Sequence, residues 1–345
     1  MKASYTQYKL IFKQPGGTSR GVLREKETWF LKIQDEQGNK GIGECGLFRG
    51  LSYDDRPDFE YTLAWVCKNI HLGQKQLVEQ MEEFPSIQIG LETAFLSLKA
   101  NDQQQLMTTD FTLGKVGIPI NGLIWMGQPD FMKQQIDEKL AQGFTCLKLK
   151  IGALDFEEEI NMIKSIRQHF DKNDLSIRVD ANGAFAPKNA IQKLEQLASL
   201  DIHSIEQPVA PEYKNSLAEL CRQTPLPIAL DESLIGITDV TKRKVLLQMI
   251  KPQFIILKPS LIGGLSGTDS WIKEAEMLGI DWWITSALES NIGLNAIAQY
   301  TSTKDIDKPQ GLGTGSLFTN NVDSPLMIKG EKLWFDTANP WKIQL

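Results

Sequence analysis

The stretch TCLKLKI at residues 145–151 decides the fold, because it places two lysines in a short segment that is otherwise largely apolar. Side chains at positions i and i+2 of a β-strand lie on the same face. Lys148 and Lys150 therefore share one face, and the leucine and isoleucine side chains share the other. A barrel strand turns its apolar face toward the surrounding helices, so the alternation predicts that both lysines point into a barrel.

Four later segments repeat this arrangement at similar spacing, each as an apolar strand with an ionisable residue near its C-terminal end. They are LSIRVDAN (175–182), HSIEQP (203–208), PIALDES (227–233) and FIILKPS (254–260). The same alternation predicts that their ionisable residues point inward: Arg178, Asp180, Glu206, Asp231 and Lys258. The C-terminal ends of barrel strands carry the active site, so these residues are candidates for one.

Three more segments complete eight strands, and helical stretches at 130–143, 155–170 and 187–200 separate the earlier ones. The added strands are IPINGLIW (118–125), DWWITSALES (281–290) and GLGTG (311–315). Repeated β and α units of this kind predict a (β/α)8 TIM barrel. An open doubly wound sheet is the alternative, but no glycine-rich phosphate loop follows the first strand.

The first hundred residues follow a different pattern. Residues 5–14 and 27–46 alternate apolar and polar side chains, whereas 59–73 and 91–102 are amphipathic with helical spacing. This pattern predicts a small α+β domain. We therefore expect an α+β capping domain at 1–113, a barrel at 114–318 and a C-terminal segment at 319–345 that packs on the capping domain.

Composition excludes several classes of protein. The chain has 345 residues, 37 Lys and Arg against 43 Asp and Glu, and a net charge of −6. A nucleic-acid or membrane-surface protein normally needs a basic face, so we expect neither partner. No apolar stretch approaches the roughly 20 residues of a membrane span. The four scattered cysteines and the N-terminus, which lacks a secretory pattern, indicate the cytoplasm. The oligomeric state stays open.

Asp180, Glu206 and Asp231 come from three consecutive predicted strands, so their carboxylates should lie close together. Buried charges must neutralise one another or bind an ion. Three carboxylates without thiol or imidazole form a hard oxygen site, which favours Mg²⁺, with Mn²⁺ as the other option.

A divalent cation that holds a substrate carboxylate stabilises the charge formed when the adjacent carbon loses a proton. We expect Lys150, nearer the strand end, to be the base, and Lys148 together with the cation to lower its pKa. If TCLKLKI is the second strand, Lys258 is on the sixth, across the barrel. The expected partner is a small carboxylate.

At these motifs the chain resembles the enolase superfamily, in its muconate-lactonizing subgroup. The motifs are KLK (148–150), VDAN (179–182), EQP (206–208), DES (231–233) and KPSLIGG (258–264). The resemblance extends over nearly the whole chain, including a cap, a barrel and a tail that rejoins the cap. It implies Mg²⁺ ligated by the three carboxylates, with Lys150 and Lys258 on opposite faces of the substrate.

Within the subgroup, three features resemble the branch that dehydrates 2-succinyl-6-hydroxy-2,4-cyclohexadiene-1-carboxylate to 2-succinylbenzoate, a step in menaquinone synthesis. They are the loop segment 41–55, the segment 286–299 that contains Glu289, and Arg178. We expect substrate contacts from Arg178, Glu289, Phe48 and Arg49, close backbone approach at Gly263, and support from Asn182 and Ser260.

Several alternatives stay open. A dipeptide epimerase resembles this chain too, but its Asp-x-Asp motif at the eighth strand is replaced by Gly313 and Gly315. An N-acylamino acid racemase or a muconate cycloisomerase uses the same architecture. A glycosidase pairing Glu206 with Glu289 leaves the inward lysines unexplained. A non-catalytic binding protein leaves the whole charged set unexplained.

Overall fold

Seven short parallel strands form the larger sheet of the computed structural model, which describes residues 1–18, 21–100, 105–339 and 341. Their order in the sheet is their order in the chain. They are β5 (Gly122–Ile124), β6 (Cys146–Lys150), β7 (Ser176–Asp180), β8 (Ser204–Glu206), β9 (Ile228–Leu230), β10 (Phe254–Leu257) and β11 (Asp281–Ile284). β6 is thus the second strand and β10 the sixth, as predicted.

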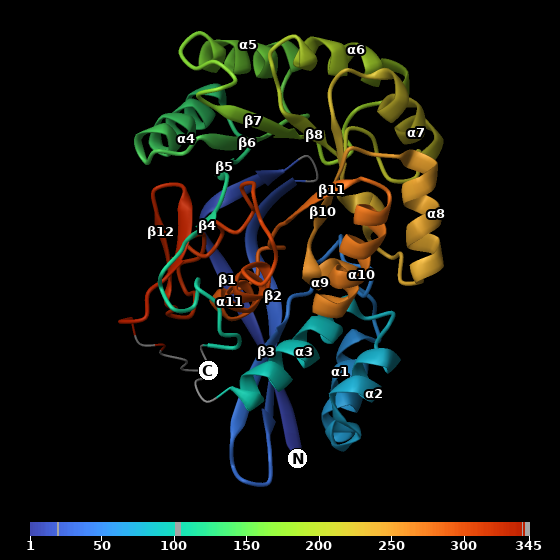
Figure 1. The fold of residues 1–345 in the computed structure, drawn as a ribbon, viewed down its shortest axis with the longest axis vertical. Coiled ribbons are helices and arrows are strands. Elements are labelled where there is room, and N and C mark those ends of the chain that lie inside the picture. The colour runs from blue at the N-terminus through green and yellow to red at the C-terminus, as the bar shows by residue number, and fades with distance from the viewer. Residues whose placement is uncertain (19–20, 101–104, 340, 342–345) are drawn as a thin grey trace.

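A helix follows each of these strands and lies on the outside of the curved sheet (Figure 1). The helices are α4 (Pro129–Ala141), α5 (Phe156–Arg167), α6 (Pro187–Ala198), α7 (Lys214–Gln223), α8 (Val240–Ile250), α10 (Gly264–Met277) and α11 (Asn291–Thr301). A 3-10 turn η2 (Glu232–Leu234) and a short α9 (Pro259–Ile262) precede α8 and α10. Proline in the first turn starts α4 and α6, where its fixed φ fits and no N–H is needed.

The barrel is closed by the chain at Gln310 and Gly311. Gln310 forms a parallel bridge with Ile120, and Gly311 forms one with Thr285. The predicted eighth strand at 311–315 is therefore reduced to two bridged residues, which begin one position earlier than expected. These bridges connect the two edges of the sheet and make it a (β/α)8-type barrel. In the described part of the chain after Gly311 no helix follows.

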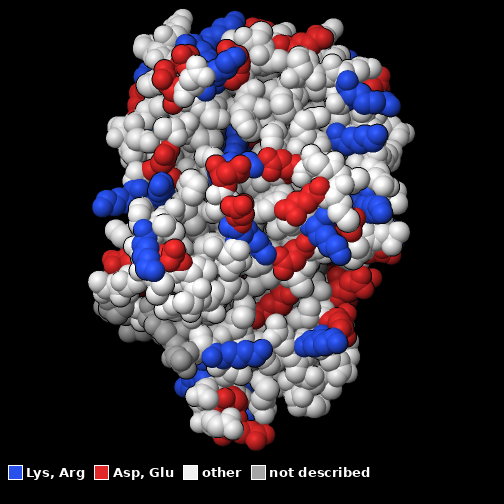
Figure 2. Space-filling view, viewed as in Figure 1, with Lys and Arg blue, Asp and Glu red and all other residues white. Residues whose placement is uncertain are grey.

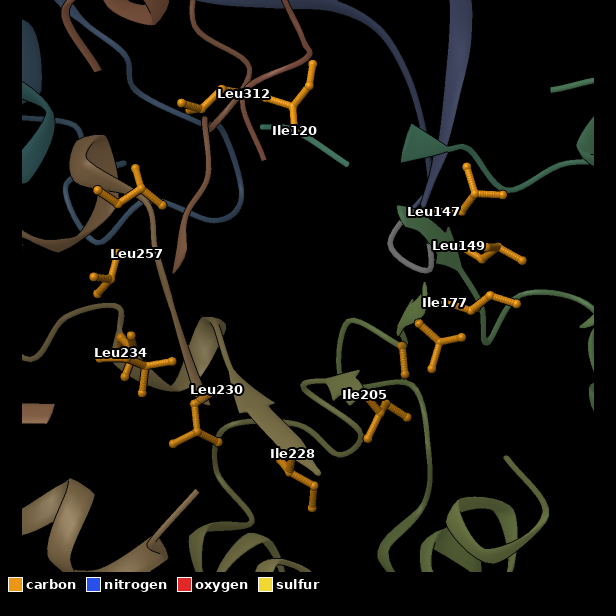
Figure 3. Packing of buried hydrophobic residues seen from close by; sticks show 14 of the residues in the cluster. Ile120, Leu147, Leu149, Ile177, Ile205, Ile228, Leu230, Leu234, Leu257 and Leu312 are labelled. Atoms are coloured by element: carbon orange, nitrogen blue, oxygen red, sulfur yellow. The ribbon is translucent and has the colours of Figure 1, made fainter. Parts of the chain in front are cut away.

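The apolar side chains of the barrel strands point outward, as the alternation predicts. Figure 3 shows them around a ring, directed away from its centre. They pack against helix residues such as Ile163, Leu194 and Leu247, all of them fully buried. The strand residues labelled in Figure 3 are Leu147, Leu149, Ile177, Ile205, Ile228, Leu230 and Leu257. Burial of this interface drives closure of the barrel, at about 1.5–3 kcal/mol for each large side chain.

The N-terminal part is an antiparallel sheet covered by helices. Its strands are β1 (Lys2–Thr18), β2 (Gly21–Gln34) and β3 (Lys40–Cys45). Its helices are α1 (Phe59–Lys68), the 3-10 helix η1 (Ile70–Leu72), α2 (Gly73–Gln80) and α3 (Pro85–Lys99). The predicted helix over 59–73 is thus interrupted at Asn69, and α2 is an element the pattern did not predict. This α+β unit is the predicted cap and lies below the barrel in Figure 1.

The segment after the barrel contacts both parts of the molecule. Phe318 bridges Phe12 of β1, and the Asn320 side chain accepts a hydrogen bond from the Ile11 N–H at 2.9 Å. Farther on, β12 (Leu326–Lys329) and β13 (Lys332–Phe335) form a small sheet with β4 (Ile118–Pro119), which precedes the first barrel strand. The predicted strand at 118–125 is therefore split between two sheets.

The molecular surface carries both charge signs. On the face shown in Figure 2, acidic and basic side chains are interspersed. Within the described residues, no helix is both long enough and apolar enough to cross a bilayer.

Asp54 anchors the loop between β3 and α1 to the start of α3. Its Oδ2 accepts hydrogen bonds from the Ser86 N–H at 2.9 Å and the Ser86 hydroxyl at 2.5 Å. Its Oδ1 is buried without a hydrogen-bond partner. Burial raises the pKa of Asp54 to about 6, although the Ser86 bonds act in the opposite direction. The carboxyl therefore binds a proton more tightly in the folded chain than in the unfolded one.

Asp54→Asn should change the pH dependence of stability. Because the folded-state pKa is raised, protonation of Asp54 stabilises the wild type as the pH falls through about 6. Between pH 7.5 and pH 5, the wild type should gain about 1.4 kcal/mol of unfolding free energy relative to the variant. Urea unfolding of both proteins at several pH values measures this difference. Parallel pH profiles would show that Asp54 is not the titrating group.

Candidate active site

Three buried carboxylates lie at the C-terminal ends of three adjacent strands. Asp180 ends β7, Glu206 ends β8, and Asp231 directly follows β9. Their exposed fractions are 0%, 2% and 2%. Asp180 and Glu206 are directly paired in register between neighbouring strands. The structure thus brings together the three carboxylates that the sequence suggested as metal ligands.

Three lysines reach these carboxylates from two walls of the barrel. Lys148 Nζ lies 2.9 Å from Asp180 Oδ2 and 2.5 Å from Glu206 Oε2. Lys150 Nζ lies 2.9 Å from Asp180 Oδ2. Across the barrel, Lys258 pairs with Asp231 and lies 3.9 Å from Glu206 Oε1. All three lysines line one cavity at the mouth of the barrel.

The charged side chains in this cluster shift one another's pKa values. Burial opposes the positive charge of Lys148, but Asp180 and Glu206 outweigh it and raise its pKa. Burial likewise opposes the charge of Lys258, and Asp231 with Glu206 raises its pKa. Burial and the neighbouring Asp180 carboxylate raise the pKa of Glu206. The neighbouring carboxylates therefore favour the protonated, positively charged forms of Lys148 and Lys258.

Asn182 positions Lys150. Its Oδ1 accepts a hydrogen bond from Lys150 Nζ at 2.8 Å, and its Nδ2 donates one to Glu232 Oε1 at 3.0 Å. Its backbone N–H donates to Asp180 Oδ1 at 3.0 Å. Asn182 adopts a φ of 45°, a left-handed conformation that asparagine tolerates better than most residues. It also lines the cavity, and its role in supporting the site stays a prediction.

The rest of the cavity is mainly apolar and comes from both domains. Phe48 and Leu51 contribute to it from the loop between β3 and α1, which we call the capping loop, and Leu23 contributes from β2. The barrel contributes apolar side chains and neutral polar groups. The lining residues from the barrel besides the lysines and Asn182 are Asn121, Leu123, Trp125, Leu261, Thr285, Ser286, Ala287, Leu288, Gly311, Gly313 and Thr314. Phe48 therefore lies in the cavity wall, and its contact with substrate stays a prediction.

Arg49 and Arg178 lie outside this lining. Arg49 forms ion pairs with Glu27 and Asp55 on the cap, at 2.8 and 2.7 Å. Arg178 is buried below the carboxylates, stacks over Trp283 at 4.1 Å and donates to the carbonyl of Pro309 at 2.8 Å. Arg49 fastens the capping loop, and Arg178 packs the barrel interior. These contacts give no support to their predicted substrate contacts.

Ser260, Glu289 and Gly263 are not in the lining either. The Ser260 hydroxyl donates to Glu289 Oε1 at 2.5 Å, and both residues are fully buried. Their chain neighbours Leu261 and Leu288 form the cavity wall instead. Gly263, with a φ of 108°, borders a separate cavity with Gln88 and Arg243. The expected close approach of Gly263 to substrate therefore has no counterpart in this arrangement.

Several functional residues were missed from the sequence. Gln207 accepts hydrogen bonds through Oε1 from the N–H groups of Asp231 and Ser233, both at 3.1 Å, and so links β8 to β9. Trp125, at the end of a predicted barrel strand, could have been found from that position. Leu23 had no such signal, because its hairpin reaches the cavity from the other domain.

The donor set suits a hard divalent cation. Among the described residues, no three His, Cys, Asp or Glu side chains are spaced to hold a metal ion as they stand. Lysine ammonium groups lie between the carboxylates: Lys148 contacts Asp180 and Glu206, and Lys258 contacts Asp231. Glu206 Oε1 is buried without a hydrogen-bond partner. Three buried carboxylates, with one oxygen left without a hydrogen-bond partner, match the preference of Mg²⁺ for oxygen ligands.

Comparison with known proteins identifies the class to which this fold and site belong. Residues 132–332 match the family model described as Enolase C-terminal domain-like. The chain therefore belongs to the enolase superfamily. Within it, the o-succinylbenzoate synthase of Desulfotalea psychrophila is 44% identical over 96% of this chain and 98% of its own. A crystal structure named MenC from the same organism has a TM-score of 0.86 and 40% identity, over 97% of this chain and 99% of that chain.

Other members of the superfamily are more distant. The L-Ala-D/L-Glu epimerase of Bacillus subtilis is 26% identical over 92% of this chain and 86% of its own. The muconate lactonizing enzyme of Pseudomonas fluorescens shares the fold, with a TM-score of 0.82 at 20% identity over 96% of this chain and 93% of that chain. The family model and the 44% identical synthase confirm the superfamily, and the structural similarities confirm the cap-and-barrel architecture inferred from the motifs.

Proposed function

We propose that this enzyme is an o-succinylbenzoate synthase, a carbon–oxygen lyase of menaquinone biosynthesis. It converts 2-succinyl-6-hydroxy-2,4-cyclohexadiene-1-carboxylate into 2-succinylbenzoate by syn-dehydration. The observation that carries the proposal is the placement of Lys150 and Lys258 on opposite walls of one cavity, with three carboxylates between them. The 44% identity to a synthase over nearly the whole of both chains selects this reaction within the superfamily.

Asp180, Glu206 and Asp231 would hold Mg²⁺, with Mn²⁺ as the alternative. When bound, the cation supplies a Lewis acid that stabilises negative charge on the substrate carboxylate. The three side chains contribute oxygen ligands only, and all three are buried. Gln207 and Asn182 restrain the backbone at Asp231 and the side chain of Asp180. Such supporting contacts keep metal-binding carboxylates in orientation.

Lys150, in its neutral form, removes the proton from the carbon next to the substrate carboxylate. The electron pair of that C–H bond moves into the carboxylate to give an enediolate. Lys258, as a cation on the opposite wall, stabilises this negative charge. The enediolate then collapses, the bond to the ring hydroxyl breaks, and Lys150 returns its proton to the departing hydroxide. Water leaves and the ring becomes aromatic, so one lysine on one face accounts for the syn geometry.

The rest of the cavity supports this sequence of steps. Asn182 orients Lys150 through a 2.8 Å hydrogen bond, and Lys148 neutralises Asp180 and Glu206. Apolar side chains such as Phe48 and Leu51 line the same cavity as the lysines and would reduce the access of water to them. Electrostatic interactions strengthen in such a site because the effective dielectric constant falls.

A dipeptide epimerase or an N-acylamino acid racemase is the second candidate function. Two opposed lysines can also exchange one α-proton between faces. A curated N-succinyl-L-Arg/Lys racemase from Bacillus cereus is 26% identical over 94% of this chain and 91% of its own. The epimerase reading is disfavoured because Gly313 and Thr314, not an acidic pair, line the cavity where a substrate ammonium would need a counter-charge.

We place the enzyme in the cytoplasm with a small dicarboxylate as its substrate. All four cysteines are within the described residues and are free, which suits a reducing compartment. No nucleic-acid or membrane partner is proposed. The oligomeric state is not assigned.

The deciding experiment incubates the purified protein with Mg²⁺ and the cyclohexadiene substrate and follows its ultraviolet absorbance. Rapid conversion that EDTA abolishes is expected. A failure to convert this substrate would overturn the synthase assignment. Deuterium exchange into dipeptides or N-succinylamino acids would then test the epimerase and racemase alternatives directly.

A further inference from the structure

Lys26 is a buried lysine whose charge has no direct partner. It lies on β2 with 6% of its surface exposed, and its ammonium nitrogen has no hydrogen-bond partner among the described residues. Burial lowers the pKa of Lys26, and Glu44 and Glu289 act in the opposite direction without contacting it. A buried cation without a partner is costly, so the fold would not retain it for stability alone.

The two acidic side chains that act on the charge of Lys26, Glu44 and Glu289, already accept hydrogen bonds from other donors. Glu44 accepts hydrogen bonds from the Thr28 hydroxyl, the hydroxyl and N–H of Ser290, and the Gly293 N–H. Glu289 accepts from the Ser260 hydroxyl and the Ala287 N–H. These neutral donors satisfy both carboxylates. The charge of Lys26 is therefore compensated only at longer range.

Lys26 lies beside the catalytic cavity, at the junction of cap and barrel. Leu10, which pairs with Lys26 across the β1–β2 sheet, packs in one apolar cluster with Trp125 and Leu288, and both of these residues line the cavity. Leu288, which precedes Glu289, lines the cavity from the barrel side. Lys26 itself does not line the cavity, and its long, flexible side chain would have to rotate to bring the ammonium group to this wall.

The cavity otherwise lacks a free cation for a second carboxylate. The lysines that line it, Lys148, Lys150 and Lys258, all pair with the acidic cluster. The other described lining residues are apolar or neutral. A dicarboxylate substrate can place one carboxylate at the acidic cluster and its cation. Its other carboxylate would then lie in a mainly apolar chamber.

We propose that Lys26 is the residue that recognises the second carboxylate of a dicarboxylate substrate, here the succinyl carboxylate. This inference rests on the proposed function and adds a specificity determinant to it. The ammonium group supplies a charge-assisted hydrogen bond to that carboxylate in the closed complex. The free protein bears the cost of the unpaired charge so that a dianion is preferred over a monoanion of the same shape.

The test compares two ligands on the full-length protein with Mg²⁺ present. The ligands are 2-succinylbenzoate and its succinyl monoamide, which has the same shape but lacks the second charge. Calorimetry should show that Lys26→Met weakens binding of the dicarboxylate at least tenfold and binding of the monoamide less than twofold. Lys26→Arg should retain most of the dicarboxylate affinity, because it keeps the charge.

Two controls separate recognition from damage to the fold. Lys9→Met removes an exposed lysine on the neighbouring strand and should change neither affinity. Lys26→Met should melt no lower than the wild type, because an unpaired buried charge has been removed. Equal weakening of both ligands, or a loss produced by Arg24→Met and not by Lys26→Met, would overturn the proposal.

The outcomes also separate this inference from the proposed function. If the wild type converts the cyclohexadiene substrate and the Lys26→Met variant does so with the same KM, the role of Lys26 is refuted. The synthase function would then still hold. A wild type that neither converts the substrate nor binds 2-succinylbenzoate would refute both.

Discussion

Lys150→Ala is expected to reduce turnover of the cyclohexadiene substrate at least about 10³-fold, because it removes the base that both takes and returns the proton. No other described group near the substrate face has the same placement: Lys148 is held by Asp180 and Glu206, and Lys258 is on the opposite wall. Steady-state kinetics with saturating Mg²⁺ measures the loss.

The fold and the metal site of the Lys150→Ala variant should stay intact. Lys150 contacts Asp180 and Asn182, and Asp180 keeps its ion pair with Lys148 when Lys150 is removed, so the melting temperature should change by only a few degrees. Binding of Mn²⁺, followed by electron paramagnetic resonance, should be equal or tighter, because a cation next to Asp180 is gone. Lys133→Ala, which removes an exposed lysine of α4, is the control. Substantial residual turnover would show that the base is another residue.

Asp231→Asn is expected to weaken Mg²⁺ binding at least about 100-fold, since it replaces a charged oxygen ligand with a neutral one. Supporting residues around metal ligands already contribute 10–100-fold to affinity, so loss of a ligand should cost no less. The same change removes the nearer of the two buried carboxylates that pair with Lys258 and leaves only Glu206 at 3.9 Å. Activity should therefore need much more Mg²⁺ and should not recover fully when the metal saturates.

Titration of activity against Mg²⁺, together with direct Mn²⁺ binding, separates these two effects. Asp281→Asn is a suitable control, because that carboxylate also pairs with a lysine, Lys308, but at the start of β11. An unchanged metal requirement in the Asp231→Asn variant would remove Asp231 from the ligand set.

The sequence predicted most of the barrel because its signal is local. A period of two in each strand separates inward lysines and carboxylates from outward leucines and isoleucines, and one residue of shift would exchange the faces. The prediction was weaker for the eighth strand, where the alternation of strands and helices ends. The eighth strand is only two bridged residues at Gln310 and Gly311, held by backbone hydrogen bonds that no side-chain pattern records.

Only some of the residues expected to contact substrate lie in the cavity wall. Phe48 and Asn182 line the cavity, whereas Arg49, Arg178, Ser260, Gly263 and Glu289 do not. These residues occupy positions in or near the motifs, but their side chains contact other parts of the protein. Arg49 forms an ion pair with Asp55 in the loop between β3 and α1, and Glu289 accepts a hydrogen bond from Ser260. A motif shows that a residue type is needed and does not show which neighbour it meets.

By itself, the sequence determined the (β/α) repeat, the inward charges and the order in which three carboxylates and two lysine strands meet. These follow from chain direction and side-chain alternation, which tertiary packing does not alter. Only the tertiary structure decided which residues form the cavity wall and that Lys26 lies unpaired beside it. Those features depend on how the cap docks on the barrel, and such contacts join residues far apart in the chain, as Glu44 and Ser290 do across the junction.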